Sequence, residues 1–223
     1  MYKYAIIVAG GSGIRMGSPV PKQFLLLRGK PVLWHTVSAF ITAYADIEII
    51  LVLPASHLDA GNDLVNAFPT HKIQITTGGD NRFSSVKKGL QFVVEKSVVF
   101  VHDGVRCLVT PALIRRCYEA TIEKGNAVPA VMATDTIRIV TGPDNEQIDR
   151  DNVRIIQTPQ TFFSDLLLIG FEQDYLPRFT DEASVVERTG IKINIIPGDG
   201  SNIKITQPVD LLIAEKILQE KES

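Results

Sequence analysis

Short apolar runs alternate along the chain with longer segments in which apolar residues recur every three or four positions. The short runs are typical of strands buried on both faces, and the longer segments are typical of amphipathic helices. The expected strands are Tyr4–Ala9, Glu48–Leu53, Lys72–Thr76, Val98–His102, Asn126–Met132 and Lys192–Ile196. The expected helices are Val32–Ala43, Leu58–Phe68, Arg82–Glu95, one that opens at Thr110-Pro111, Ser164–Tyr175, Asp181–Thr189 and Pro208–Lys221. This alternation predicts an α/β fold, a Rossmann-like, mainly parallel twisted sheet flanked by helices.

The alternation breaks at Thr134. Two β-prone runs, Thr136–Val140 and Arg154–Gln157, flank a polar, turn-rich stretch that begins at Gly142-Pro143. We predict a hairpin arm over about residues 134–157 that projects from a single domain spanning residues 1–223. Because a two-stranded hairpin alone is marginally stable, we expect a partner surface for the arm. The alternative is a surface hairpin without a partner.

The run Tyr4–Ala9 leads directly into a glycine-rich loop. Glycine has no Cβ, so such a loop can turn tightly and bring free backbone N–H groups to an anion. Two cations, Arg15 and Lys22, lie in or just beyond the loop. Together these features predict a polyphosphate site, and the alternative is a glycine turn with two solvated cations. The glycines are Gly10, Gly11, Gly13 and Gly17.

Two common phosphate loops do not fit this stretch. A Walker A loop needs Ser or Thr after its lysine, but Gln23 follows Lys22. A dinucleotide-binding loop needs a third small residue where Met16 stands. It also needs an acidic residue after the second strand, which here ends at Leu53-Pro54. A dinucleotide-dependent oxidoreductase is therefore disfavoured, and it remains the alternative from a different class.

Composition excludes several classes of protein. The 223 residues are 45% hydrophobic and carry a net charge of −2, so no overall basicity favours nucleic acid. No apolar run reaches the roughly 18 residues of a membrane span. The two cysteines are too few for a disulfide framework, and the chain opens on a strand with no room for a signal peptide. We therefore expect a cytoplasmic protein with no membrane and no nucleic-acid partner.

In a mainly parallel sheet, ligands bind at the carboxyl ends of the strands. This rule gathers Gly10–Lys22, Gly78–Ser85 and Asp103–Arg106 at one edge. Asp103 ends a buried strand, where a carboxylate needs a nearby cation. A Mg²⁺ ion carried by a triphosphate is one such cation, and pairing with Arg106 or capping of the loop is the alternative.

Other reactive side chains are expected to be structural. His102 lies inside an apolar strand, and His35 lies in a helix with no acidic or nucleophilic neighbour in sequence. Cys107 has no identifiable His and Asn partners, so a thiol nucleophile is not expected.

The string from Gly10 to Gln23, G-G-S-G-I-R-M-G-x-x-x-P-K-Q, resembles the signature loop of the sugar nucleotidyltransferases. Further motifs follow in the order found in one branch, the 2-C-methyl-D-erythritol 4-phosphate cytidylyltransferases of the non-mevalonate isoprenoid pathway. They are GGDNRFSSV, VHDGVR, DTIR, DR, QTPQTF, TDEAS and NIKIT. Cys107 stands where the family usually has Pro. Ser201 stands where relatives often have an acidic residue, with Asp199 two positions earlier.

The resemblance implies a role for each matching position. Arg15 and Lys22 would be the catalytic cations. CTP would contact Ala9, Gly10, Gly11, Gly13, Gly79, Asp80, Ser85, Asp103 and Gly104. The acceptor polyol phosphate would contact Arg106, Thr136, Arg150, Thr180 and Lys204. Asp103 would be a ligand of Mg²⁺, and the arm would join two chains in a homodimer.

The implied chemistry is direct nucleotidyl transfer. An acceptor phosphate oxygen attacks the α-phosphorus of CTP in line, and pyrophosphate leaves. That nucleophile is already anionic near neutral pH, so no general base is needed, and fixed cations with Mg²⁺ supply electrostatic stabilisation. Ribitol-5-phosphate cytidylyltransferase, which shares PKQ, TPQ and NIKIT-like strings, is the nearest alternative. A catalytically silent nucleotide-binding module is a third, which the presence of both cations disfavours.

Overall fold

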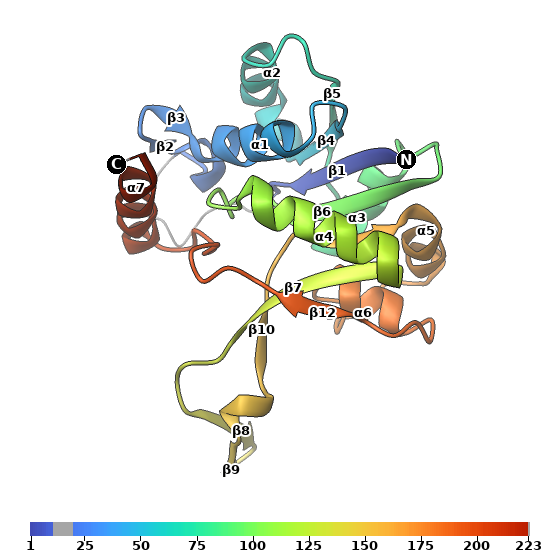
Figure 1. Cartoon of the computed structure of the whole chain (residues 1–223), viewed down its shortest axis with the longest axis vertical. Coiled ribbons are helices and arrows are strands. Elements are labelled where there is room, and N and C mark those ends of the chain that lie inside the picture. Colours follow the sequence, from blue (N-terminus) through green and yellow to red (C-terminus); the bar gives the residue numbers. More distant parts are fainter. Residues whose placement is uncertain (11–19, 223) are drawn as a thin grey trace.

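The computed structural model describes residues 1–10 and 20–222 and is built around a mixed, mostly parallel sheet (Figure 1). Its strands run in the order β10-β7-β11-β6-β1-β4-β5, and β12 pairs with β7. The strands of this sheet are β1 (Tyr2–Val8), β4 (Glu48–Leu53), β5 (Ile73–Thr77), β6 (Ser97–Asp103), β7 (Asn126–Met132), β10 (Arg154–Ile156), β11 (Gln160–Phe163) and β12 (Ile195–Pro197). The helices are α1 (Val32–Ala43), α2 (Leu58–Asn66), α3 (Arg82–Leu90), α4 (Pro111–Lys124), α5 (Ser164–Glu172), α6 (Glu182–Glu187) and α7 (Pro208–Glu222). The α/β fold predicted from the sequence is confirmed.

The parallel part of the sheet consists of β5, β4, β1 and β6, whose carboxyl ends meet at one edge. The unpredicted strand β11 runs antiparallel between β6 and β7. It has only four residues and begins with the polar pair Gln160-Thr161, so it lacks the apolar run by which the other strands were recognised. Its antiparallel course makes the sheet mixed.

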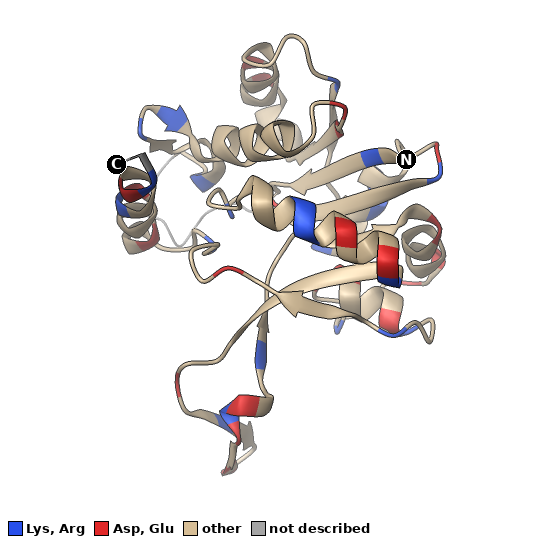
Figure 2. Cartoon of the chain, in the orientation of Figure 1, with Lys and Arg blue, Asp and Glu red and all other residues tan. Residues whose placement is uncertain are grey.

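The core lies on both faces of the sheet, which explains the uninterrupted apolar runs in the strands. On one face, Ile7 of β1 packs with Phe40 of α1 and Ile114 of α4. On the other, Ile6 packs with Val86 of α3 and the residues of α5. Charged residues of both signs follow one another along the outer side of α4 (Figure 2). In the part of the chain that the structure describes, no helix is long and apolar enough to cross a membrane.

Helix α2 forms although Gly61 interrupts its pattern. A Cβ on Gly61 would lie 2.4 Å from Cδ1 of Leu53 in the sheet. The glycine therefore gives the close approach between helix and sheet that a larger residue would prevent. Helix α4 begins as expected, because the Thr110 side chain accepts a hydrogen bond from the backbone N–H of Leu113 and Pro111 is the first helical residue.

The arm projects from the sheet as predicted (Figure 1), but the predicted pairing of its strands is wrong. Strand β8 (Ile137–Thr141) pairs with β9 (Asp144–Ile148), and not with the run at Arg154. The connection is the two-residue turn Gly142-Pro143, in which Gly142 has φ +60°, as a tight hairpin turn of type II′ requires. The run at Arg154 is β10, which pairs with β7 in the main sheet. The hairpin therefore closes at Gly142-Pro143 and ends well before the β-prone run at Arg154, which had been expected to form its second strand.

A small pair of strands, β2 (Leu26–Leu27) and β3 (Lys30–Pro31), precedes α1. Leu27 packs with Ala214 of the closing helix α7 and with Ile205. This cluster brings the C-terminal part of the chain beside the segment that follows the glycine-rich loop, which places Lys204 near Lys22.

Candidate active site

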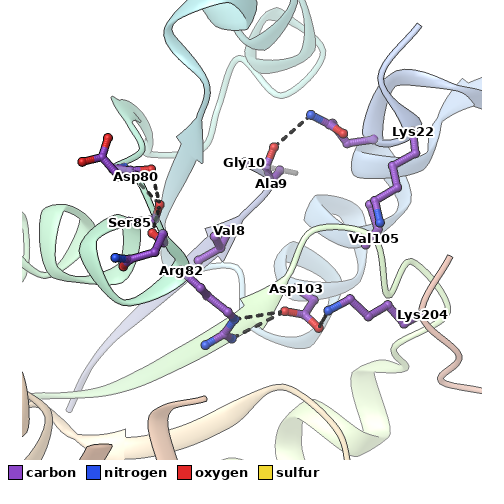
Figure 3. A pocket seen from close by; sticks show the side chains of 13 residues that line it. Val8, Ala9, Gly10, Lys22, Asp80, Arg82, Ser85, Asp103, Val105 and Lys204 are labelled. Carbon is purple, nitrogen blue, oxygen red and sulfur yellow. Dashed lines mark hydrogen bonds and ion pairs between the residues drawn. The ribbon is translucent and has the colours of Figure 1, made fainter. Parts of the chain in front are cut away.

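A cavity of about 330 Å³ lies at the carboxyl edge of the parallel strands (Figure 3). Its walls come from the end of β1, the segment between β5 and α3, the end of β6 and the segment before α7. Among the residues predicted from the sequence, it brings together Ala9, Gly10, Lys22, Gly79, Asp80, Ser85, Asp103 and Lys204. The predicted residues Gly11, Gly13 and Arg15 lie outside the described residues.

Lys22 stands in a 3₁₀ turn, Lys22–Phe24, at the side of the cavity. Its Nζ donates to the carbonyl of Ile205 at 3.1 Å. The next residue, Gln23, is 1% exposed and donates from Nε2 to the carbonyl of Ala9 at 2.9 Å. Gln23 therefore joins the lysine turn to the end of β1, a role that sequence reasoning missed although the residue belongs to the PKQ motif.

The segment from Gly78 to Ser85 forms the opposite wall and is held by its own hydrogen bonds. The Asn81 side chain caps α3 by accepting from the N–H of Ser84 at 2.8 Å. Ser85 Oγ accepts from the N–H of Gly79 at 3.1 Å and donates to the carbonyl of Asn81 at 2.8 Å. The exposed Asp80 lines the cavity between these fixed points. Hydrogen bonds within the segment itself thus organise this wall.

Asp103 is 8% exposed and lies among three cationic side chains. Its Oδ2 is 3.0 Å from Lys204 Nζ and 3.3 Å from Arg106 Nε, and its Oδ1 is 3.5 Å from Arg82 Nε. Burial alone would raise the pKa of this carboxyl, but the charges of Arg82, Lys204 and Arg106 outweigh burial and hold the pKa well below its ordinary value. Asp103 is therefore an anion that gathers cations at the cavity. The pairing with Arg106, which the sequence left as an alternative, is present.

Partly exposed Arg82 and buried Glu182 form an ion pair that sequence reasoning missed. Glu182 is 1% exposed, and its two carboxylate oxygens accept from NH1 and NH2 of Arg82, the latter at 3.0 Å. Burial raises the pKa of Glu182, and the adjacent guanidinium opposes that rise. Both residues stand inside recognised motifs, GGDNRFSSV and TDEAS, and membership of those motifs was the only signal that could have singled them out.

The side chains around Asp103 do not fit a metal ion held by the chain itself. Among the described residues, no group of three or more His, Cys, Asp or Glu side chains could hold a metal. Both oxygens of Asp103 already face cations, and a Mg²⁺ ion at this carboxylate would have to displace Lys204. We therefore derive no catalytic step through a metal bound to Asp103.

His102 and the cysteines are structural, as expected. His102 is fully buried, and burial lowers its pKa to about 3. Its Nδ1 accepts from the Thr158 hydroxyl at 2.9 Å, and its Nε2 donates to the carbonyl of Arg106 at 3.2 Å. Burial also raises the pKa of Cys107 and of Cys117 to about 12, so neither is a thiolate near neutral pH.

The other predicted residues are not in the cavity lining. Gly104 faces β1, where a Cβ would lie 2.8 Å from that of Ala9, so this glycine serves the packing of the two strands. Arg106 stands behind Asp103 and also donates to the carbonyl of Asn202 at 2.9 Å. Thr180 is exposed just before the Asp181 cap of α6. Thr136 and Arg150 lie on the arm, around a separate hollow of about 360 Å³.

Comparison with known proteins agrees with this geometry over the whole chain. Residues 3–220 match the family model of 2-C-methyl-D-erythritol 4-phosphate cytidylyltransferase. The chain is 43% identical over 219 residues to the protein of that name from Phocaeicola vulgatus, with 98% of this chain and 100% of the relative covered. It is 44% identical over 220 residues to the one from Bacteroides thetaiotaomicron, with the same coverage. It is similar to the crystal structure of 4-diphosphocytidyl-2C-methyl-D-erythritol synthase from Anaerococcus prevotii, with a TM-score of 0.85, 28% identity and 98% of both chains covered.

Three findings lead to one assignment. The family model matches almost the full length of the chain, the relatives are covered from end to end, and the fold is shared. The chain belongs to the 2-C-methyl-D-erythritol 4-phosphate cytidylyltransferase family and is a nucleotidyltransferase.

Proposed function

We propose that the cavity at the carboxyl edge is where the family's reaction takes place. In that reaction CMP passes from CTP to 2-C-methyl-D-erythritol 4-phosphate, and 4-diphosphocytidyl-2-C-methyl-D-erythritol and pyrophosphate are formed. The observation that carries this proposal is the meeting of Lys22, Lys204 and Asp103 with the ordered wall at Gly79–Ser85 in one cavity. A second hollow, on the arm, joins only the DTIR and DR motifs at Thr136 and Arg150.

The proposed roles follow from charge and position. CTP lies along the ends of β1 and β5, with its base against Gly79, Asp80 and Ser85 and its phosphates toward Gly10 and Lys22. Lys22 stabilises the negative charge that develops on the α-phosphoryl oxygens during in-line attack. Arg15, Gly11 and Gly13 are assigned to the same phosphates by their place in the motif. Gly104 supports the site indirectly through the packing of β6 on β1.

No general base is part of the proposal. The acceptor phosphate is a dianion near neutral pH and can attack directly, so the task of the protein is to bring two polyanions together. Asp103 pairs with both Lys204, which lines the cavity, and Arg106, which stands behind that carboxylate. We assign them to the acceptor phosphate, together with Thr180.

We propose that Thr136 and Arg150 act at the site of the partner chain in a homodimer. They resemble acceptor-binding residues, but they lie on the projecting arm (Figure 1). A two-fold dimer allows each arm to cross to the cavity of the other chain. The forked guanidinium of Arg150 is then suited to the acceptor phosphate of the partner site. The apolar side chains exposed on the arm, Ile139 and Val140, support an interface there.

We propose Mg²⁺ as part of the substrate, bound to the phosphate oxygens of CTP, because the described residues include no group of three or more His, Cys, Asp or Glu side chains that could hold it. Activity should then follow the concentration of the Mg–CTP complex and vanish with EDTA. The melting temperature of the nucleotide-free protein should be the same with and without EDTA. A lower melting temperature in EDTA would show that the chain itself holds a metal.

The proposed function is tested by pyrophosphate release from four nucleoside triphosphates, each with methylerythritol phosphate and with ribitol phosphate. The expected result is turnover with CTP and methylerythritol phosphate. UTP should be poorer by about tenfold or more, because a pocket built for the exocyclic amine leaves buried groups unpaired when uracil enters. Preferential use of ribitol phosphate would assign the other cytidylyltransferase activity, and no turnover with any pair would overturn both.

We also propose that the enzyme works in the cytoplasm. The support for this location is that both cysteines are free and buried, as is usual in a reducing compartment.

A further inference from the structure

Two paired charged residues have no part in the reaction as proposed: Glu182, which is buried, and Arg82, which is partly exposed and lines the cavity. They stand 100 positions apart in sequence, one at the start of α3 and the other at the start of α6. The guanidinium of Arg82 faces both oxygens of Glu182 in a two-pronged contact. Such contacts are strong and fix the orientation of the planar group. Arg82 is therefore held mainly from the side of α6.

The same guanidinium also reaches Asp103, but less closely. Arg82 Nε and NH2 are each 3.5 Å from Oδ1, whereas Lys204 Nζ is 3.0 Å from Oδ2. Figure 3 shows Arg82 and Lys204 approaching Asp103 from opposite sides. Because the two terminal nitrogens of Arg82 bind Glu182, the closest contact of the Asp103 carboxylate is with Lys204 and not with Arg82.

The residues on both sides of Glu182 are anchored to the sheet, so the backbone that carries its carboxylate is held in place. Its neighbour Asp181 accepts from Gln160 Nε2 at 2.9 Å, and the N–H of Ala183 donates to Gln160 Oε1 at 2.8 Å. Gln160 is 1% exposed and belongs to β11 in the middle of the sheet. The carboxylate of Glu182 is thus a fixed point built on the sheet.

We propose that Glu182 is a positioning residue for the acceptor side of the site: by holding Arg82 it keeps Asp103 in contact with Lys204 and so sets the place of the lysine ammonium. This inference rests on the proposed function, which gives Lys204 to the acceptor phosphate. Arg82 lines the cavity between Asp80 and Ser85, but its guanidinium contacts Glu182 and Asp103. We therefore expect the effect of Glu182 on the acceptor side rather than on CTP.

The first test is Glu182→Gln, which removes the charge and keeps the size. Arg82 then turns its fork to Asp103, and Lys204 loses its closest partner. The KM for methylerythritol phosphate should rise on the order of tenfold, the size expected when a hydrogen bond to a charged group is lost. The KM for CTP should stay within about twofold, since its proposed contacts do not include Arg82, Glu182 or Lys204. Glu187→Gln is the matched control, because Glu187 is an exposed residue of the same helix and should change neither KM.

The second test asks whether the effect passes through Arg82 and Lys204. When Arg82→Gln or Lys204→Ala is already present, adding Glu182→Gln should not raise the acceptor KM further. Glu182→Asp, which retains the charge, should recover part of the acceptor affinity. Because these comparisons use kinetic ratios on folded protein, loss of stability alone does not produce the expected pattern.

Several outcomes would overturn the inference. An acceptor KM in Glu182→Gln equal to that of Glu187→Gln, with only a lower melting temperature, would leave Glu182 a purely structural role. Equal rises in both KM values, or full additivity with Lys204→Ala, would also contradict it. Should Glu182→Gln not fold, an acceptor KM in folded Glu182→Asp no different from wild type would overturn it as well. A wild-type protein without pyrophosphate release would instead overturn the proposed function.

Discussion

The cavity and the arm are organised in opposite ways. At the cavity, Asp103 is almost buried and meets cations from three other places in the sequence. On the arm, Ile139 and Val140 are 44% and 72% exposed, and the Arg138 side chain donates to Asn145 of the same hairpin. A single chain therefore orders the described walls of the cavity, whereas the arm leaves apolar surface that a second chain can cover. The difference teaches that one subunit orders the described cavity walls alone, whereas we expect the arm to act only in the assembled dimer.

The largest expected effect concerns the cavity. Lys22→Ala should lower kcat by roughly 10²–10³, as for the loss of one fixed donor to a developing anion, while CTP binding weakens far less. Arg15→Ala should behave in the same way. Steady-state kinetics and CTP titration are the measurements, and Lys30→Ala, an exposed lysine near Trp34, is the control. Near-normal turnover in Lys22→Ala would remove its catalytic role.

The second prediction joins the two regions. Lys22→Ala and Arg150→Ala, each nearly inactive, should recover about a quarter of wild-type activity when mixed and allowed to exchange subunits. Random exchange makes about half of the molecules heterodimers, and each heterodimer has one site with both defects and one with neither. Mass measurement must first verify the exchange. Activity that stays at the single-variant level after verified exchange would refute a site shared between chains.

The third prediction separates the arm from the cavity. Val140→Asp places a charge on the exposed arm and should shift the protein from dimer to monomer, since burying an unpaired charge at an interface is unfavourable. Turnover should fall by about tenfold or more for lack of the partner's arm, while CTP binding is retained. Light scattering measures the assembly state, steady-state kinetics the turnover, and CTP titration the binding. Val94→Asp, at a position 79% exposed and away from the arm, is the control. A fully active monomer would contradict the role of the arm.

The smallest expected effect concerns His102, the buried residue before Asp103 in β6. His102 has a pKa of about 3 in the folded protein, whereas an unfolded histidine has a pKa of about 6.5. Its neutral form contributes stability fully above about pH 6.5, and this contribution is lost as the pH falls toward 3, because only the unfolded state takes up the proton there. At pH 5 the loss amounts to about 2 kcal/mol of the free energy of unfolding.

His102→Gln removes this titration. Between pH 7 and pH 5 its unfolding free energy, measured by urea denaturation, should therefore fall by about 2 kcal/mol less than that of the wild type. His57→Gln, a partly exposed site, serves as the control. Parallel pH profiles for wild type and His102→Gln would show that His102 is not held neutral by the fold.

Much of the site was predictable because a parallel sheet collects the carboxyl ends of its strands. Gly79, Asp80, Ser85 and Asp103 follow apolar runs in sequence, and topology alone brings them to one edge. The strand at Gln160 was not predictable, because it has no apolar run of its own and is stabilised by the strands on both sides. The Arg82–Glu182 contact was equally hidden, since nothing local relates residues 100 positions apart.

By itself the sequence determined most of the order of strands and helices and the family of the chain, and it predicted an anion-binding loop after β1. These properties depend on local periodicity, on glycine and cation spacing and on motifs, all of which can be recognised from the order of residues in the sequence. Only the tertiary structure decided that β9 rather than the run at Arg154 pairs with β8, and that Asp103 lies among three cations rather than facing an open metal site. Strand pairing and ion pairing depend on distances in space, which chain closure and core packing set after the local elements have formed.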